Sequence, residues 1–221
     1  THIWTDSVMT AKFGETHYDW ANMPMSYEKF NDTQATAVAL LMRHLGISVE
    51  MYYAAESSGA RQTLVPQALA QYFRYGSTAR LLTASDYDAA TWDRMMRKEI
   101  DSNRPVIYTG EGPFDFRTPH AIAQNFDHGF VLDGYRDNLF HFNFGWNGSG
   151  NGYFAISAIT STDRSFEFAN KQQAVIGITP LKAENCAPLQ LDCQGKYEGF
   201  YTTLTTLKAG EKQSVHLSDL S

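Results

Sequence analysis

Three stretches of the chain carry apolar residues at the spacing of an amphipathic helix. The first follows the capping residues Asn31 and Asp32 and runs to Gly46, because a glycine is common just past the end of a helix. The second covers about residues 64–73, with Pro66 in its first turn, and the third covers about residues 91–102. We expect the apolar faces of these helices to belong to the core. They are formed by Val38, Leu41, Met42, Leu45, Val65, Leu69, Phe73, Trp92, Met95, Met96 and Ile100.

From residue 105 the apolar residues take the spacing and composition of β-strands. The pattern predicts an extended segment over 47–53 and strands over 105–110, 128–135, 139–144, 153–159 and 174–178. The turn at 136–138 joins two of these strands in a hairpin. Residues 111–127 form a long loop of the kind that often carries function. Helices followed by an antiparallel sheet indicate an α+β fold.

Both ends of the chain suggest that more polypeptide belongs to it. Beyond Pro180 the sequence changes to Thr-rich alternation around residues 201–207. We therefore predict one domain over residues 1–180, followed over 181–221 by a linker and the start of a C-terminal β domain. The chain opens on Thr1 and stops at Ser221 with no helix cap or turn, so we expect it to be part of a longer product.

The composition indicates a folded chain and restricts the classes of partner that it could bind. Of its 221 residues 43% are hydrophobic and 14% aromatic, as in globular domains. The net charge of −6 argues against nucleic acid, which needs a basic surface. No apolar run approaches the roughly 20 residues of a membrane-spanning helix, and no signal peptide opens the chain. We therefore expect neither nucleic acid nor a membrane as a partner.

Only two cysteines occur, Cys186 and Cys193. In a secreted protein they would pair and close a short loop. Two free thiols are the alternative, and without further Cys or His nearby they make a poor zinc site.

One histidine lies where the predicted hairpin could use it for chemistry. His128 begins a strand and precedes Gly129, where a small residue lets a substrate backbone approach. A turn centred near residue 137 makes positions 128 and 143 near cross-strand neighbours. The amide oxygen of Asn143 would then fix one imidazole tautomer and leave the other nitrogen to take a proton, with Trp146 shielding the bond from water. A buried histidine is more often structural than catalytic, so both interpretations stay open at this point.

A metal site is a further interpretation of the histidines. His120, His128 and His141 would be its ligands, but the interval from 120 to 128 follows no usual ligand spacing. We expect the remaining histidines at the surface. They are His2, His17, His44 and His216.

Three segments around His128 read His-Gly-Phe-Val-Leu-Asp-Gly-Tyr (128–135), Phe-His-Phe-Asn-Phe-Gly-Trp-Asn-Gly (140–148) and Asn-Gly-Tyr-Phe (151–154). Together they resemble the active-site hairpin of the streptopain family of secreted bacterial cysteine peptidases. The family's substrate loop is resembled by residues 56–60, and the helix and strand that precede that loop are resembled by residues 41–53. The last strand of the family's catalytic domain is resembled by residues 173–178. The resemblance covers about residues 15–180 and implies a papain-like fold.

The resemblance also implies roles for individual residues, and no cofactor or metal. His128 falls on the catalytic histidine, Asn143 on the asparagine that orients it, and Trp146 on a tryptophan beside the site. Phe144 replaces a second tryptophan. The implied substrate-binding residues are Ser57, Ser58, Gly59, Asp127, which replaces a common glycine, and Gly129.

The nucleophile of the family has no counterpart in the chain. In the family a cysteine opens a helix that precedes the segment resembling residues 15–50, whereas no cysteine here precedes Cys186. We therefore expect part of a secreted bacterial cysteine endopeptidase for protein or peptide substrates. Its nucleophile, its signal peptide and any pro-segment would be encoded upstream, so that this chain alone is inactive. The alternative is a catalytically dead homologue that binds peptide or haem-protein ligands.

Overall fold

The computed structural model describes residues 2–4, 7–24, 28–54, 58–113, 125–160 and 166–181. The chain divides into two compact units, Thr1–Thr179 and Pro180–Ser221. Only residues 180 and 181 of the second unit are described, so the start of a β domain there, and the predicted domain bounds, stay predictions.

The first unit contains three α-helices, four 3₁₀ turns and ten strands within its described residues. The α-helices are α1 (Asp32–Ser48), α2 (Val65–Tyr72) and α3 (Ala89–Asp101). The 3₁₀ turns are η1 (Phe13–Glu15), η2 (Trp20–Asn22), η3 (Gln62–Leu64) and η4 (Ala84–Asp86). The strands are β1 (His2–Trp4), β2 (Ser7–Met9), β3 (Tyr52–Tyr53), β4 (Ser58–Gly59), β5 (Arg80–Thr83), β6 (Val106–Pro113), β7 (Asn125–Arg136), β8 (Leu139–Asn143), β9 (Gly152–Phe154) and β10 (Asn170–Ile176).

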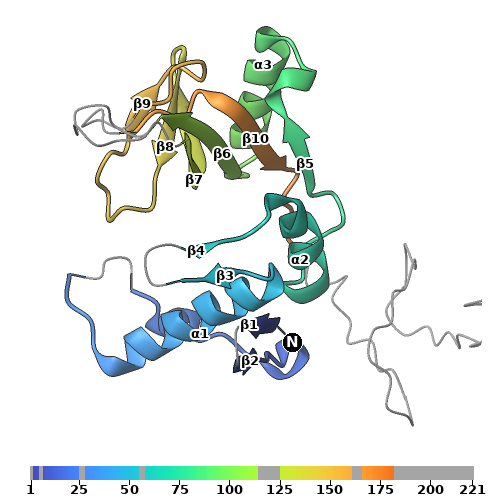
Figure 1. The fold of residues 1–221 in the computed structure, drawn as a ribbon, viewed down its shortest axis with the longest axis vertical. Coiled ribbons are helices and arrows are strands. Elements are labelled where there is room, and N and C mark those ends of the chain that lie inside the picture. The colour runs from blue at the N-terminus through green and yellow to red at the C-terminus, as the bar shows by residue number, and fades with distance from the viewer. Residues whose placement is uncertain are drawn as a thin grey trace, which may run out of the picture. The chain divides into compact units, whose positions relative to one another are not determined.

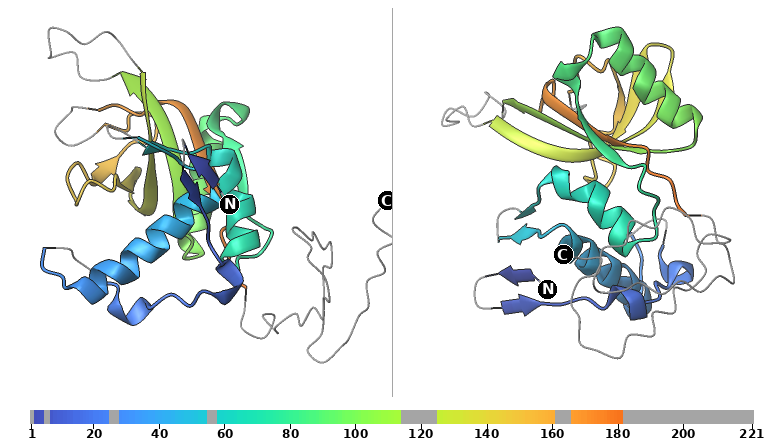
Figure 2. Two further views of the ribbon diagram at one scale, coloured as in Figure 1. Left: turned by 60° about the horizontal axis from the view of Figure 1, so that its bottom comes forward. Right: turned by 90° about the vertical axis from the view of Figure 1, so that its right-hand side faces the viewer.

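A six-stranded antiparallel sheet carries most of the core. Its strand order is β5-β10-β6-β7-β8-β9, so the C-terminal strand β10 lies between β5 and β6. Helix α3 packs on one face of this sheet, as Figures 1 and 2 show. The alternation along β6 sends Tyr108 into that core, whereas Ile107 faces the other side, toward α1 and α2. The α+β, papain-like fold predicted from the sequence is confirmed.

The core is built from aromatic side chains around one buried chain of hydrogen bonds. The Trp92 indole N–H donates to the Tyr108 hydroxyl at 2.9 Å, and that hydroxyl donates to Gln172 at 2.8 Å. Because each buried polar group has a partner, the hydrogen bonds offset the cost of desolvation and fix how α3 sits on the sheet. Burial also raises the pKa of the Tyr108 hydroxyl, which keeps it protonated as a donor.

Helix α1 begins as the sequence predicts and ends later. Asn31 caps it in a reciprocal pair of bonds with Gln34, at 3.0 and 3.1 Å. The sequence predicts Gly46 just past the end of this helix, and this prediction is wrong. Gly46 lies inside the helix, where a Cβ would overlap the hydroxyl of Tyr53. The left-handed residue is instead Glu50, with φ of 53°.

The burial on α1 also differs from the prediction. Met42 and Leu45, expected in the core, are 62% and 37% exposed. His44, expected at the surface, is only 4% exposed, and its Nδ1 lies 3.0 Å from the Tyr18 hydroxyl. Burial, helped by the charge of Arg43, lowers the pKa of His44. The N-terminal segment therefore covers a side of α1 that includes His44 and is turned away from Met42 and Leu45.

The predictions for the other elements have mixed outcomes. Helices α2 and α3 and strands β6, β7 and β8 are confirmed, with ends that differ by a few residues. Strands β1, β2, β4 and β5 were not predicted, and the first two residues of the predicted extended segment 47–53 belong to α1. The prediction of a loop over 111–127 is wrong at both ends, because β6 runs on to Pro113 and β7 starts at Asn125.

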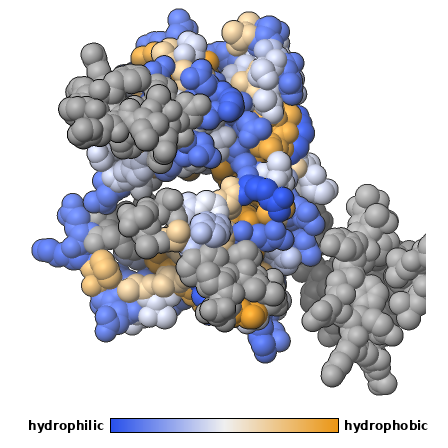
Figure 3. All heavy atoms as spheres, viewed as in Figure 1, coloured by the Kyte–Doolittle hydropathy of each residue, from blue (hydrophilic) through white to orange (hydrophobic). Residues whose placement is uncertain are grey.

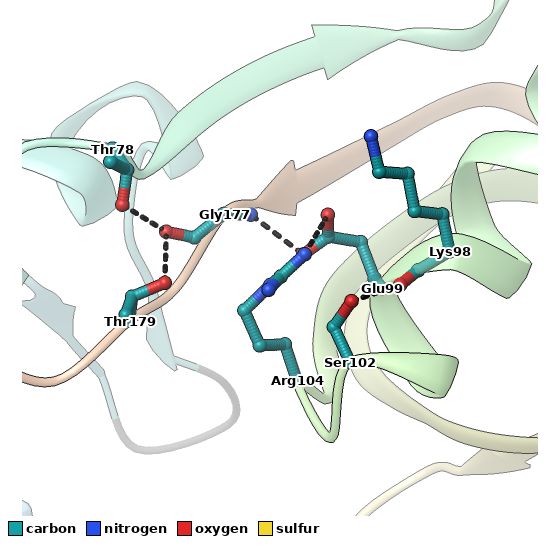
Figure 4. A network of polar contacts seen from close by, with 7 residues as sticks. All are labelled: Thr78, Lys98, Glu99, Ser102, Arg104, Gly177 and Thr179. Carbon is teal, nitrogen blue, oxygen red and sulfur yellow. Dashed lines mark hydrogen bonds and ion pairs between the residues drawn. The ribbon is translucent and has the colours of Figure 1, made fainter.

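A buried carboxylate ties the end of α3 to the end of β10 (Figure 4). Glu99 accepts two hydrogen bonds from the Arg104 guanidinium, at 2.8 and 2.9 Å, and one from the Gly177 N–H at 2.9 Å. Burial opposes ionisation of Glu99, but these donors outweigh it and lower its pKa. A folded-state pKa below the unfolded one gives stability that is present at neutral pH and is lost as the pH falls through the folded value.

Replacing Glu99 with Gln should therefore cost about 2–3 kcal/mol of unfolding free energy at pH 7, because the buried donors lose a charged acceptor. The difference from wild type should shrink as the pH falls below the ordinary glutamate value of 4.5. Urea unfolding at pH 7 and pH 3 measures both. The control is Glu50→Gln, whose ion pair with Arg61 at 3.3 Å is exposed and is expected to contribute less than about 0.5 kcal/mol. Equal unfolding midpoints for the Glu99 variant and wild type at pH 7 would rule out this role.

Candidate active site around His128

His128 lies near the start of β7, opposite Gly110 of β6, and is half-buried. Its Nε2 is 2.7 Å from the carbonyl oxygen of Phe144, and its ring stacks on Trp146 with centroids 4.7 Å apart and planes at 21°. A carbonyl oxygen only accepts hydrogen bonds, so Nε2 is the protonated nitrogen. In the neutral ring Nδ1 then carries the lone pair that can take a proton.

The register of the hairpin differs from the predicted one. Asn143 lies opposite Val131, and the pairing shifts by one residue between Leu132 and Gly134. The prediction that positions 128 and 143 are near cross-strand neighbours is therefore wrong, because the sequence shows neither the exact turn nor the irregularity. The side-chain oxygen of Asn143 accepts a hydrogen bond from the Gly145 N–H at 3.0 Å.

The loop after β8 brings Phe144 and Trp146 to the imidazole. Gly145 adopts a φ of 77°, a left-handed conformation that a side chain would strain. The N–H of Phe144 donates to the side-chain oxygen of Asn151 at 2.9 Å, and the Ser149 N–H donates to the Trp146 carbonyl at 2.9 Å. The loop is thus ordered by its own hydrogen bonds, and Asn151 is a site residue that the sequence analysis missed.

Further aromatic rings surround the histidine on the core side. The Phe168 and Phe130 ring centroids lie 5.8 and 6.1 Å from that of His128, and Phe166 lies 4.9 Å from Trp146. These rings limit the space in which the imidazole can turn and reduce water on that side.

Two glycines let the segment that carries Phe166 and Phe168 cross β6 at close range. A Cβ at Gly110 would collide with the Phe168 carbonyl, and one at Gly112 with the Glu167 carbonyl. A glycine repeat inside a strand is a signal for such a close approach. The sequence analysis missed it because it assigned residues 111–127 to a loop.

The residues predicted to bind substrate lie on two different sheets. Asp127 and Gly129 are exposed on β7, whereas Ser58 and Gly59 are exposed in the two-stranded sheet of β3 and β4; Ser57 lies outside the described residues. No contact among them tests their role, which stays a prediction.

One side chain connects the segment after β4 to the strand beside His128. Gln62 donates to the Ile107 carbonyl at 3.2 Å and accepts from the Thr109 hydroxyl at 2.7 Å. Thr109 lies directly opposite Gly129 in the sheet. The residues that follow Ser58 and Gly59 are thereby held against the same part of β6 that pairs with the start of β7.

Of the other two candidate metal ligands and the two cysteines, only His141 belongs to the residues that the structure describes. His141 contacts Asp133 through its Nδ1 at 2.5 Å, and His120, Cys186 and Cys193 lie outside the described residues. Among the described residues no three His, Cys, Asp or Glu side chains gather as a metal site would require. Within that same part of the chain no helix has the length and apolar character to cross a membrane.

Comparison with known proteins identifies close relatives. The profile of the Peptidase C10 family matches residues 2–154. The chain is 33% identical over 191 residues to the thiol protease/hemagglutinin PrtT of Porphyromonas gingivalis, and 31% identical over 177 residues to streptopain of Streptococcus pyogenes. The structure of active wild-type interpain A cysteine protease of Prevotella intermedia aligns with a TM-score of 0.68 at 33% identity, over 76% of this chain and 67% of that one.

The relatives are longer than this chain. The matches cover 83% of this chain but 20% of PrtT, and 77% of this chain but 42% of streptopain. A structure of a prointerpain A fragment from the same Prevotella species aligns over 78% of this chain and 51% of its own, with a TM-score of 0.62. A large part of each relative therefore has no counterpart in these 221 residues.

The close crossing over β6 gives a test of the site's scaffold. Gly110→Ala should lower the free energy of unfolding by about 1–3 kcal/mol, because backbone atoms of Phe168 have to move away from the strand. The matched control is Gly129→Ala, whose Cβ would meet its nearest atom, in Thr109, at an ordinary 3.7 Å and should leave stability within about 0.5 kcal/mol. Chemical denaturation compares the two, and equal stabilities would show that the crossing does not constrain the strand.

Proposed function

The chain belongs to the Peptidase C10 family, and we propose that it supplies the histidine-bearing part of the active site of a cysteine endopeptidase. His128 is the general base and acid in this proposal, and the nucleophilic cysteine lies on a segment that precedes the chain in the complete protein. The observation that carries the proposal is the imidazole itself, which is held at Nε2 by the Phe144 carbonyl and stacked on Trp146.

The position of the cysteines supports an upstream nucleophile. Cys186 and Cys193 are the only cysteines, and both come after β10, the last strand of the six-stranded sheet. Neither fits the order of the family, in which the nucleophile precedes the histidine. The relatives also have unmatched length in which such a cysteine can lie.

An uncovered apolar pocket supports the same proposal. It has a volume of about 650 Å³ and is lined almost entirely by apolar atoms, mostly from α1 and α2, with Ile107 of β6, Met9 of β2 and Tyr53 of β3 also contributing. Figure 3 shows apolar side chains at the surface in the part of the molecule that α1 and α2 form. Covering apolar surface of this kind with a partner lowers the free energy of the protein in water. We assign the segment that carries the nucleophile as that partner, because it would bury the face of α1 that the N-terminal residues leave exposed.

The chemistry follows from the tautomer of His128. Nδ1 takes the proton of the cysteine thiol, and the resulting thiolate attacks the carbonyl carbon of the scissile peptide. The carbonyl electrons move onto oxygen, where backbone N–H groups and an upstream glutamine stabilise them. As the tetrahedral intermediate collapses, the C–N bond breaks and Nδ1 protonates the leaving amine. Water then gives one proton to Nδ1 while its oxygen attacks the thioester carbon. The C–S bond breaks to release the carboxylic acid, and Nδ1 returns its proton to the departing sulfur, which regenerates the thiol.

The remaining roles complete the proposal. Asp127 and Gly129 on β7, with Ser57, Ser58 and Gly59, border the groove for protein or peptide substrates. Nε2 keeps its bond to Phe144 throughout, so the ring is held in place while Nδ1 exchanges protons. The complete protein is secreted, with a signal peptide and a pro-segment upstream of this chain.

The proposal is tested in the complete protein by an assay of protein cleavage and of its inhibition by thiol reagents of the E-64 type. His128→Ala should lower kcat by at least about 100-fold, the usual contribution of a positioned general acid and base. The matched control is His141→Ala, which removes a histidine of the neighbouring strand that contacts Asp133. That variant should retain activity. Cleavage that survives His128→Ala, or that thiol reagents do not block, contradicts the assignment.

The upstream sequence separates the enzyme from the alternative of a non-catalytic binder. A Cys at the start of an upstream helix supports the peptidase. A Ser or Ala there, together with peptide or haem-protein binding without cleavage, supports a homologue that keeps the groove and has lost the reaction.

A further inference from the structure

We propose that Asn151 is a positioning residue for His128, and that it acts together with Asn143 through the backbone of Phe144. The inference rests on the proposed function for its catalytic consequence. The contact that it explains, between His128 Nε2 and the Phe144 carbonyl at 2.7 Å, is a property of this chain alone.

The peptide group between Phe144 and Gly145 is held at both its oxygen and its N–H. Its oxygen accepts the hydrogen bond of His128, and its N–H donates to the side-chain oxygen of Asn143 at 3.0 Å. A peptide group is planar, so a bond at its N–H also fixes the direction of its C=O. Asn143 thus acts on the imidazole indirectly, because it holds the plane of the peptide group that the imidazole contacts.

The preceding peptide group, between Asn143 and Phe144, is also held by a side chain. The N–H of Phe144 donates to the side-chain oxygen of Asn151 at 2.9 Å. Asn151 is half-buried, whereas Asn143 is exposed, so water competes less for the bond of Asn151. The two asparagines hold the peptide groups on both sides of the Phe144 Cα, and together they leave the carbonyl little freedom to turn.

The loop needs these two side chains because strand pairing has ended. Strand β8 ends at Asn143, and the residues that follow include left-handed backbone at Gly145, Gly148 and Gly150, with φ of 77°, 84° and 78°. Such a backbone makes no ladder of its own, and glycine adds conformational freedom. Asparagine side chains that accept from backbone N–H groups take over the role that a neighbouring strand plays elsewhere.

A backbone carbonyl sets the imidazole tautomer in a way that a side-chain amide does not. The carbonyl can only accept, whereas an asparagine amide presents both an acceptor and a donor and can reverse them by turning. The held carbonyl of Phe144 therefore keeps the proton on Nε2 and the lone pair on Nδ1. Any change that lets this carbonyl turn away should mix the two neutral tautomers of His128.

The test measures the His128 tautomers by ¹⁵N NMR of the imidazole in the 221-residue chain, at a pH where the ring is neutral. Wild type should show the Nε2–H form in excess. Asn151→Leu, which keeps the shape and removes the acceptor, should lower the ratio of Nε2–H to Nδ1–H about fivefold, the effect of one ordinary hydrogen bond. Asn151→Asp, which keeps an acceptor for the Phe144 N–H, should restore the wild-type ratio.

Ser149→Ala is the matched control, because it changes an exposed side chain of the same loop and keeps the backbone bond from Ser149 to Trp146. It should leave the tautomer ratio unchanged. If the Leu variant does not fold, Asn151→Ala is measured in its place. An unchanged ratio in a folded variant without the acceptor, or a failure of Asn151→Asp to restore it, overturns the proposal.

A kinetic arm in the complete protein links the tautomer to the reaction. Asn151→Leu should lower kcat in proportion to the fall in the fraction of the Nε2–H tautomer, which is smaller than the fivefold change in the ratio because that form is in excess, and leave KM within about twofold. Asn151→Asp should recover kcat. The two arms separate the possible failures: a shifted tautomer without any wild-type cleavage contradicts the proposed function, whereas an unshifted tautomer contradicts the role of Asn151.

Discussion

The pairing of β7 with β8 fixes where the loop after β8 meets His128. A shift by one residue between Leu132 and Gly134 places Asn143 opposite Val131 at the end of β8. The first residues of β7 therefore extend past the last residue of β8, and His128 meets the loop that follows instead of a strand. The contacts of the imidazole with the Phe144 carbonyl and with Trp146 both result from this offset.

The other side of the site depends on the close approach of a second segment to β6. Gly110 lies opposite His128, and its missing side chain lets the segment of Phe166 and Phe168 cross β6. The aromatic rings of that segment then pack beside Trp146 and the imidazole. One part of the site is thus held by main-chain hydrogen bonds and the other by packed aromatic rings. The apolar pocket beside α1 is a separate feature, which we attribute to the segment that brings the nucleophile.

Much of the fold could be predicted from local patterns. The cap at Asn31, Pro66 in the first turn of α2 and the apolar period of α3 each have a local cause, and each prediction is confirmed. The failures concern long-range packing. The burial of His44 depends on Tyr18, which lies 26 residues away in the sequence, and the role of Gly110 depends on a segment more than fifty residues later. For the site, the motif predicts roles for His128 and Trp146, which lie in contact, but the hydrogen-bond acceptor is a backbone carbonyl, which no residue type reveals.

The most direct test of this account is a measurement of the scalar coupling across the hydrogen bond of His128. In a chain labelled with ¹⁵N and ¹³C, such a coupling connects the donor nitrogen to the carbonyl carbon of the acceptor. We predict a correlation between His128 Nε2 and the backbone carbonyl carbon of Phe144, in keeping with their 2.7 Å contact. A correlation from Nε2 to the side-chain carbonyl carbon of Asn143 instead would contradict the account, because Asn143 would then orient the imidazole directly.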